Sequence, residues 1–186
     1  IDKIVIKTSD SLIFDIQLNA KVCFDKLQMI TARKTLGTGE AAMATSALGF
    51  GCMGITAFYG DPMPDDQAID LLKRAASLGV THWDTAEVYQ AKNSSDGSSI
   101  YNETVVGKAI AAVGRDKIHI ASKYQPFLHG NELTPELAIN AAKASCKRLG
   151  VETIDLYYAH RFAANTPVEE QARAMNAVKS AGLSRY

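Results

Sequence analysis

T-H-W-D-T-A-E-V-Y, residues 81–89, is the stretch from which the fold of this chain can be predicted. Its apolar start is typical of a short buried strand that ends at Asp84, and Tyr89 follows five positions later. A carboxylate and a phenol close to the end of a buried strand indicate chemistry as well as packing. Similar strand ends elsewhere in the chain would support this interpretation.

Two further apolar runs end on polar residues. I-H-I-A-S-K ends at Lys123, and I-D-L-Y-Y-A-H ends at His160. The 39 residues from 84 to 123 and the 37 from 123 to 160 each leave room for a strand, a helix and two loops. Such alternation builds a parallel sheet whose reactive residues gather at the carboxyl ends of its strands. We therefore expect an α/β fold that brings Asp84, Tyr89, Lys123 and His160 together.

Helix signals fall between these strands. The predicted helices cover residues 65–78, 103–113 and 134–150, and a fourth begins in a capping-box pattern at residues 166–169. Thr134 and Pro135 are typical of a helix start, while Gly79 and Gly114 are typical of helix ends.

The remaining segments predict turns and loops. Residues 33–46 contain Gly37 and Gly39 and predict a hairpin. Residues 47–54 predict a short strand that runs into glycine-rich backbone, which allows close approach of a ligand or is simply a turn. Residues 90–101 are polar and predict a flexible loop over the site, able to act as a lid.

Composition excludes several function classes. The 20 basic and 20 acidic residues balance, and no Lys/Arg cluster indicates a nucleic-acid or membrane surface. No apolar run approaches the roughly 20 residues of a membrane span. Three cysteines, Cys23, Cys52 and Cys146, have no metal-type spacing, so we expect reduced thiols and a cytoplasmic protein.

The chain divides into two unequal parts in our prediction. Residues 1–30 begin at Ile1 and lead into no clear partner strand, so we expect an extension outside the main fold. Residues 31–186 form the α/β domain. Met29 is a plausible natural start for that domain.

The four polar residues suit the reduction of a carbonyl group. A free tyrosine has a pKa of about 10 and donates its proton reluctantly, but a lysine ammonium nearby stabilises the phenolate. Tyr89 would act as the acid, and Lys123, in an ion pair with Asp84, would stabilise its phenolate. His160 would donate the hydrogen bond that orients the carbonyl. Each residue alone is also compatible with a structural role, so the prediction rests on their joint placement.

These segments resemble the aldo-keto reductase family. The resemblance rests on residues 48–54, 79–89, 102–110, 120–124 and 155–161, and it extends over about residues 33–186. It implies a (β/α)8 barrel of the TIM type, NADPH as hydride donor, aldehydes or ketones as small-molecule substrates, and Asp84, Tyr89, Lys123 and His160 as the catalytic residues. It also implies that Gly51, Cys52 and Met53 bind the nicotinamide end of the cofactor together with Asp84.

Two departures from the family pattern are evident. Gln90 and an insertion follow Tyr89, where the family commonly has glycine. About four βα units are present, so we expect a fragment or truncated product, with exposed sheet edges that favour self-association.

The alternative function is a non-catalytic binding or regulatory protein on the same scaffold.

Overall fold

A parallel sheet forms the centre of the protein. The computed structural model describes residues 32–39, 42–93 and 95–186, so the predicted extension over residues 1–30 lies outside the described part. The strand order is β3-β4-β7-β8, with the bounds Gly49–Gly51, His82–Asp84, His119–Tyr124 and Leu156–Ala159. All three neighbouring pairs are parallel. The predicted α/β fold is confirmed.

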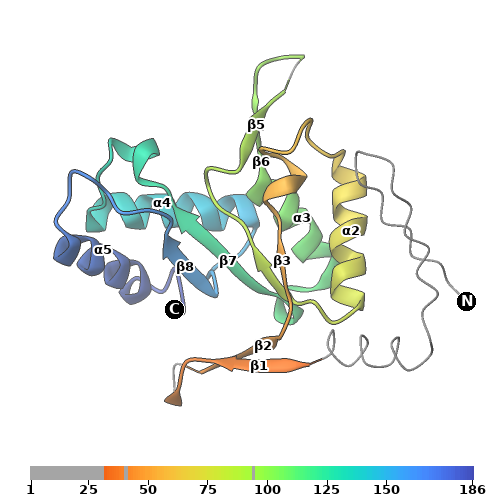
Figure 1. The fold of residues 1–186 in the computed structure, drawn as a ribbon, viewed down its shortest axis with the longest axis horizontal. Coiled ribbons are helices and arrows are strands. Elements are labelled where there is room, and N and C mark those ends of the chain that lie inside the picture. Colours follow the sequence, from red (N-terminus) through yellow and green to blue (C-terminus); the bar gives the residue numbers. More distant parts are fainter. Residues whose placement is uncertain (1–31, 40–41, 94) are drawn as a thin grey trace, which may run out of the picture.

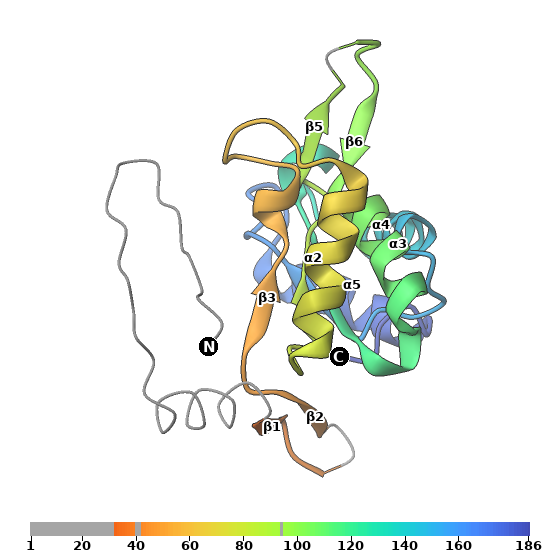
Figure 2. The same ribbon diagram turned by 90° about the vertical axis from the view of Figure 1, so that its right-hand side faces the viewer.

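Four helices alternate with these strands. They are α2 (Asp65–Ser77), α3 (Asn102–Val113), α4 (Pro135–Leu149) and α5 (Val168–Ser180). Each helix packs against the next in chain order, and α2, α3 and α4 lie on one side of the sheet (Figures 1 and 2). The predicted helices are therefore confirmed, with ends that differ by one or two residues.

The starts of α4 and α5 differ in how they are capped. Thr134 Oγ1 accepts a hydrogen bond from Leu137 N at 3.4 Å, as its position predicts. The predicted capping box at Thr166 is wrong, because no side chain caps α5. Thr166 Oγ1 instead accepts from Leu133 N at 2.9 Å. The Thr166 hydroxyl thus binds a buried backbone amide in another loop and does not cap α5, although the local sequence pattern predicts a cap.

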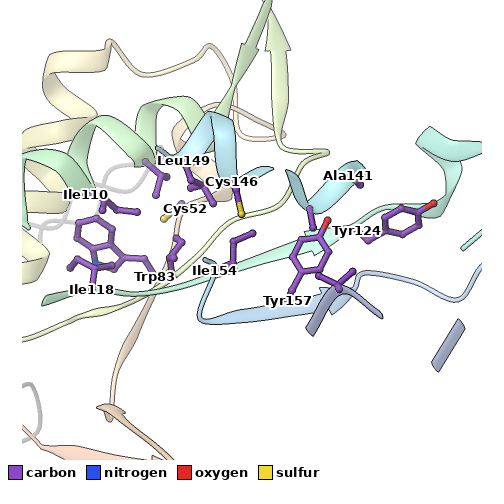
Figure 3. Packing of buried hydrophobic residues seen from close by; sticks show 14 of the residues in the cluster. Cys52, Trp83, Ile110, Ile118, Tyr124, Ala141, Cys146, Leu149, Ile154 and Tyr157 are labelled. Carbon is purple, nitrogen blue, oxygen red and sulfur yellow. The ribbon is translucent and has the colours of Figure 1, made fainter. Parts of the chain in front are cut away.

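The core lies between the sheet and the helices (Figure 3). Trp83 and Tyr124 have no exposed surface, and each buried apolar side chain of this size contributes on the order of 1.5–3 kcal/mol. Cys52 and Cys146 are free buried thiols whose pKa values burial raises, whereas Cys23 lies outside the described residues.

Two antiparallel hairpins lie at opposite ends of the sheet (Figures 1 and 2). The predicted hairpin is confirmed as β1 (Arg33–Leu36) and β2 (Met43–Ser46). The second, β5 (Gln90–Lys92) and β6 (Ser99–Tyr101), replaces the loop that we predicted. Polar side chains stabilise its turn locally: Asn93 Oδ1 accepts from Ser95 N, and Asp96 Oδ1 accepts from Ser98 N.

Short segments complete the described chain. Three 3-10 helices are η2 (Met53–Ile55), η3 (Arg115–Lys117) and η4 (Pro126–His129). Residues 183–186 run beside residues 154–157, with Ile154 and Ser184 in a parallel bridge and Tyr157 N donating to Tyr186 O at 2.9 Å. Among the described residues, no helix combines the length and the apolar character needed to cross a bilayer.

Candidate active site

The four predicted site residues lie at the carboxyl end of the sheet. Asp84 is the last residue of β4, Lys123 is the penultimate residue of β7, and His160 directly follows β8. Tyr89 comes from the loop after β4. Parallel pairing of consecutive strands places their carboxyl ends at one edge, so the sheet itself brings these residues together.

Lys123 is the centre of this cluster. Its ammonium contacts Asp84 Oδ1, donates to Thr85 O at 2.8 Å and lies 3.3 Å from the Tyr89 hydroxyl. The Lys123 side chain is 13% exposed, so its charge is largely removed from water. The carboxylate and the carbonyl hold the ammonium in place, and the third contact directs it toward the phenol.

Tyr89 and His160 are in edge-to-face contact. Their ring centroids are 5.7 Å apart with planes at 87°. Both rings line a pocket of about 380 Å³, together with Met53, Phe58, Val88, Gln125, Phe127 and Arg161. The pocket therefore joins an apolar wall to the two side chains that are able to bind a carbonyl oxygen.

Burial and nearby positive charges favour the neutral form of His160. Burial lowers the pKa of its imidazole, and the positive charges of Lys123 and Arg161 lower it further, against a smaller opposing effect of Asp84. A neutral imidazole can still donate one hydrogen bond. This state suits a group that orients a carbonyl oxygen without protonating it.

The segment Gly51–Met53 adjoins the same cluster. Gly51 pairs with Asp84 in the register of β3 and β4, and Cys52 N donates to Asp84 O at 2.8 Å. A Cβ atom on Gly51 would meet nothing within 4 Å, so open space borders its backbone beside Asp84. The Cys52 side chain is fully buried. These residues fit a flat ring held through main-chain contacts, as expected for the nicotinamide end of NADPH.

Phe58 adds a strained position to the pocket wall. It has a φ of 69°, a left-handed conformation that non-glycine residues rarely adopt. Its ring is 73% exposed and meets the Tyr89 ring edge-on, with centroids 6.5 Å apart. Strain of this kind clusters at ligand-binding sites, which makes Phe58 a further candidate for contact with substrate.

Sequence reasoning missed two buried polar residues that support the site. Glu87 accepts from Gln125 N at 2.5 Å and pairs with His129, with 3.0 Å between Oε1 and Nε2. Burial raises the pKa of Glu87, against the opposing effects of Gln125 N–H and His129. Asn102 has no exposed surface and bonds to several segments at once. Glu87 lies between the predicted site residues Asp84 and Tyr89, and Asn102 directly precedes the predicted helix of residues 103–113, so these positions were the available signals.

Comparison with known proteins decides the family. The model of the Aldo/keto reductase family matches residues 47–186. The chain belongs to this family. "Probable aldo-keto reductase 1" of Glycine max is 38% identical over 153 residues, which are 80% of this chain and 42% of the relative. Aldo-keto reductase yakc of Schizosaccharomyces pombe, whose name specifies NADP(+), is 38% identical over 149 residues, which are 75% of this chain and 41% of that one.

Solved aldo-keto reductases have the same fold. A thermostable aldo-keto reductase in complex with the inhibitor epalrestat matches with a TM-score of 0.66 and 32% identity, over 82% of this chain and 52% of that one. An aldo-keto reductase of Klebsiella pneumoniae in complex with NADPH matches with a TM-score of 0.62 and 29% identity. The match covers 83% of this chain and 48% of that one. This aldo-keto reductase chain therefore spans about half of the barrel structures and less than half of its curated relatives.

Proposed function

We propose that this chain contains the catalytic residues of an NADPH-dependent carbonyl reductase, which converts aldehydes or ketones to alcohols. One observation carries the proposal: the Lys123 ammonium contacts both the Asp84 carboxylate and the Tyr89 hydroxyl. Membership of the aldo/keto reductase family supports it. The substrate is a small carbonyl compound that enters the pocket beside Tyr89 and His160.

Each residue has a distinct role in the proposed mechanism. The neutral His160 imidazole donates a hydrogen bond to the substrate carbonyl and orients it. The Tyr89 hydroxyl donates its proton to the carbonyl oxygen as negative charge develops there. Lys123 stabilises the phenolate that remains, and Asp84 holds Lys123 in position. Correct placement of these groups contributes more to the rate than any one of them alone.

NADPH supplies the hydride when it is bound. Gly51, Cys52 and Met53 would hold its nicotinamide end through the backbone, and Asp84 would lie beside it. Two relatives support this cofactor, since NADP(+) or NADPH is named with each of them.

Replacing Tyr89 by Phe tests the proposal on the 186-residue chain. Wild-type protein should oxidise NADPH in the presence of an aldehyde, and Tyr89→Phe should reduce kcat by about 10²- to 10⁴-fold, the usual contribution of a general acid. Tyr59→Phe is the matched control, because Tyr59 is 76% exposed and outside the pocket lining. Isothermal titration with NADPH should give the same affinity for all three proteins.

Two results would contradict the proposal. Folded wild-type protein that binds NADPH but turns over no aldehyde would favour the alternative of a binding or regulatory protein. A Tyr89→Phe variant with undiminished turnover would remove the phenol from the mechanism.

The proposal extends to organisation and surroundings. We place residues 31–186 in one barrel domain and the protein in the cytoplasm, where the free thiols Cys52 and Cys146 would stay reduced.

Strand β3 pairs on one side only within the described residues, so a second copy of the chain can pair with its free edge. Sedimentation at several protein concentrations tests this self-association, and a monomer at all of them would reject it.

A further inference from the structure

Asn102 lies where three segments of the proposed site meet. It is the first residue of α3, and its side chain is fully buried beneath the carboxyl end of the sheet. Its Nδ2 donates to Cys52 O and to Thr56 Oγ1, both at 2.8 Å. Its Oδ1 accepts from Thr85 Oγ1 at 2.6 Å. Both polar atoms of the amide are thus engaged, each with groups outside α3.

The first segment that Asn102 holds is the proposed nicotinamide-binding backbone. The Cys52 carbonyl accepts from Asn102, and the Cys52 amide donates to Asp84 O. The peptide groups on both sides of Cys52 are therefore fixed, one by a side chain and one by the neighbouring strand.

The second and third segments lead to Lys123 and Tyr89. Thr85, whose hydroxyl binds Asn102, offers its carbonyl oxygen to the Lys123 ammonium at 2.8 Å. The Tyr89 carbonyl accepts from Asn102 N at 2.8 Å and from Thr56 Oγ1 at 3.4 Å. One residue therefore fixes the backbone on which the acid, its lysine partner and the cofactor-binding segment all depend.

We propose that Asn102 is a positioning residue that sets the distance between the Tyr89 hydroxyl, the Lys123 ammonium and the Gly51–Met53 backbone. Its amide is suited to this task, because it offers two donors and one acceptor to three fixed groups without adding a charge to the buried site. The inference rests on the proposed function for its catalytic readout only. The geometry itself can be tested without turnover.

The first test compares Asn102→Ala with Asn140→Ala, a control on the exposed surface of α4. If Asn102 positions the site, kcat at saturating NADPH should fall by about 100-fold in Asn102→Ala and remain unchanged in the control, because displacements near 1 Å have effects of that order. Thr85→Val removes a single link and is the second variant should Asn102→Ala fail to fold.

The second test follows His160 by NMR. The chain has four histidines, so their titrations can be assigned by substitution. Lys123 is one of the groups that lower the pKa of His160, so release of Lys123 in Asn102→Ala or Thr85→Val should raise the titration midpoint of His160. His119, at the other end of β7, is the internal control and should not move.

The outcomes separate this inference from the proposed function. A wild-type chain without turnover would reject the proposed function, while the His160 titration would still decide the role of Asn102. The positioning role is overturned if Asn102→Ala folds and leaves both kcat and the His160 titration midpoint unchanged. If Asn102→Ala does not fold, the same result for Thr85→Val overturns it. A shift of the His160 midpoint without a shift of His119 supports it.

Discussion

The Lys123 ammonium lies 3.3 Å from the Tyr89 hydroxyl, although the two residues are 34 positions apart in the chain. The contact depends on the parallel pairing of β4 with β7, which brings the loop after Asp84 against the end of the next strand. A largely buried lysine beside a phenol has a clear electrostatic consequence. It favours the phenolate that remains after proton donation.

Lys123→Met should therefore abolish most of the proposed activity. We expect kcat to fall by about 10²-fold or more, because the phenolate loses its cationic neighbour. Lys108→Met is the matched control, since Lys108 pairs with Asp65 at 2.5 Å on the exposed surface. NADPH oxidation with an aldehyde gives the rates, and equal effects of the two substitutions would contradict the role of Lys123.

Three half-buried histidines should make the folded state sensitive to acid. Burial is the main cause that lowers the pKa values of His82, His119 and His160 below 6.5. The unfolded chain then binds more protons than the folded chain at pH values between 6.5 and these lowered values. The contribution of the three residues to the free energy of unfolding is thus fully present above pH 6.5. It is lost as the pH falls through that window.

Urea denaturation at a series of pH values measures this dependence. His119→Gln should make the decline below about pH 6.5 shallower, because one titrating group is removed. Glu87 has the opposite effect on stability. Burial raises its pKa, so protonation on acidification removes a buried charge that destabilises the folded state. Glu87→Gln should therefore make the decline steeper. An identical slope in the wild type and both variants would show that these groups do not control acid stability.

Breaking the buried pair between Glu103 and Arg148 should strongly destabilise the protein. Glu103 has no exposed surface, and its carboxylate accepts from Arg148 Nε and Ser122 Oγ, both at 2.5 Å. Arg148→Met leaves this carboxylate buried without a cation and should lower the free energy of unfolding by about 3–5 kcal/mol. Arg173→Met, which breaks an exposed pair with Glu170, should lower it by less than about 1 kcal/mol. Similar urea midpoints for the two variants would contradict the prediction.

Gly107 should not tolerate a methyl group. A Cβ atom there would lie 2.6 Å from Leu149 O and 2.8 Å from Arg148 O, at the point where α3 crosses the end of α4. Helix propensity alone predicts that Gly107→Ala stabilises the protein by about 1 kcal/mol. We expect instead a loss of about 1–3 kcal/mol from overpacking. Gly51→Ala, where a Cβ meets nothing within 4 Å, is the control for stability, and a higher melting temperature for Gly107→Ala would reject the steric argument.

Much of the fold follows from the sequence, because its signals are local. Apolar runs that end at Asp84, Lys123 and His160 mark three strands, and glycines after the helices mark their ends. The spacing between these strands then predicts the parallel order. The placement of the four site residues follows from that order, whereas their catalytic roles stay predictions.

The failures have several causes. Thr166 has the sequence of a helix cap but binds the Leu133 amide, 33 residues away, which no pattern around Thr166 indicates. Residues 90–101 have the composition of a loop, yet their backbone pairs as a hairpin whose base is closed by Asn102 N and Tyr89 O. The importance of Asn102 likewise depends on three segments that meet only in the folded chain.

The order β3-β4-β7-β8 also bears on how the protein is made. Each strand of this sheet pairs with the sheet strand that comes before it in the chain, and residues 183–186 continue the series beside β8. No strand of this parallel sheet therefore waits for a partner that is synthesised much later, within the part of the chain described. As the chain leaves the ribosome, each sheet strand therefore appears when its earlier partner has already been synthesised. Both partners of the contact between Lys123 and Asp84 are likewise synthesised before β8 and His160.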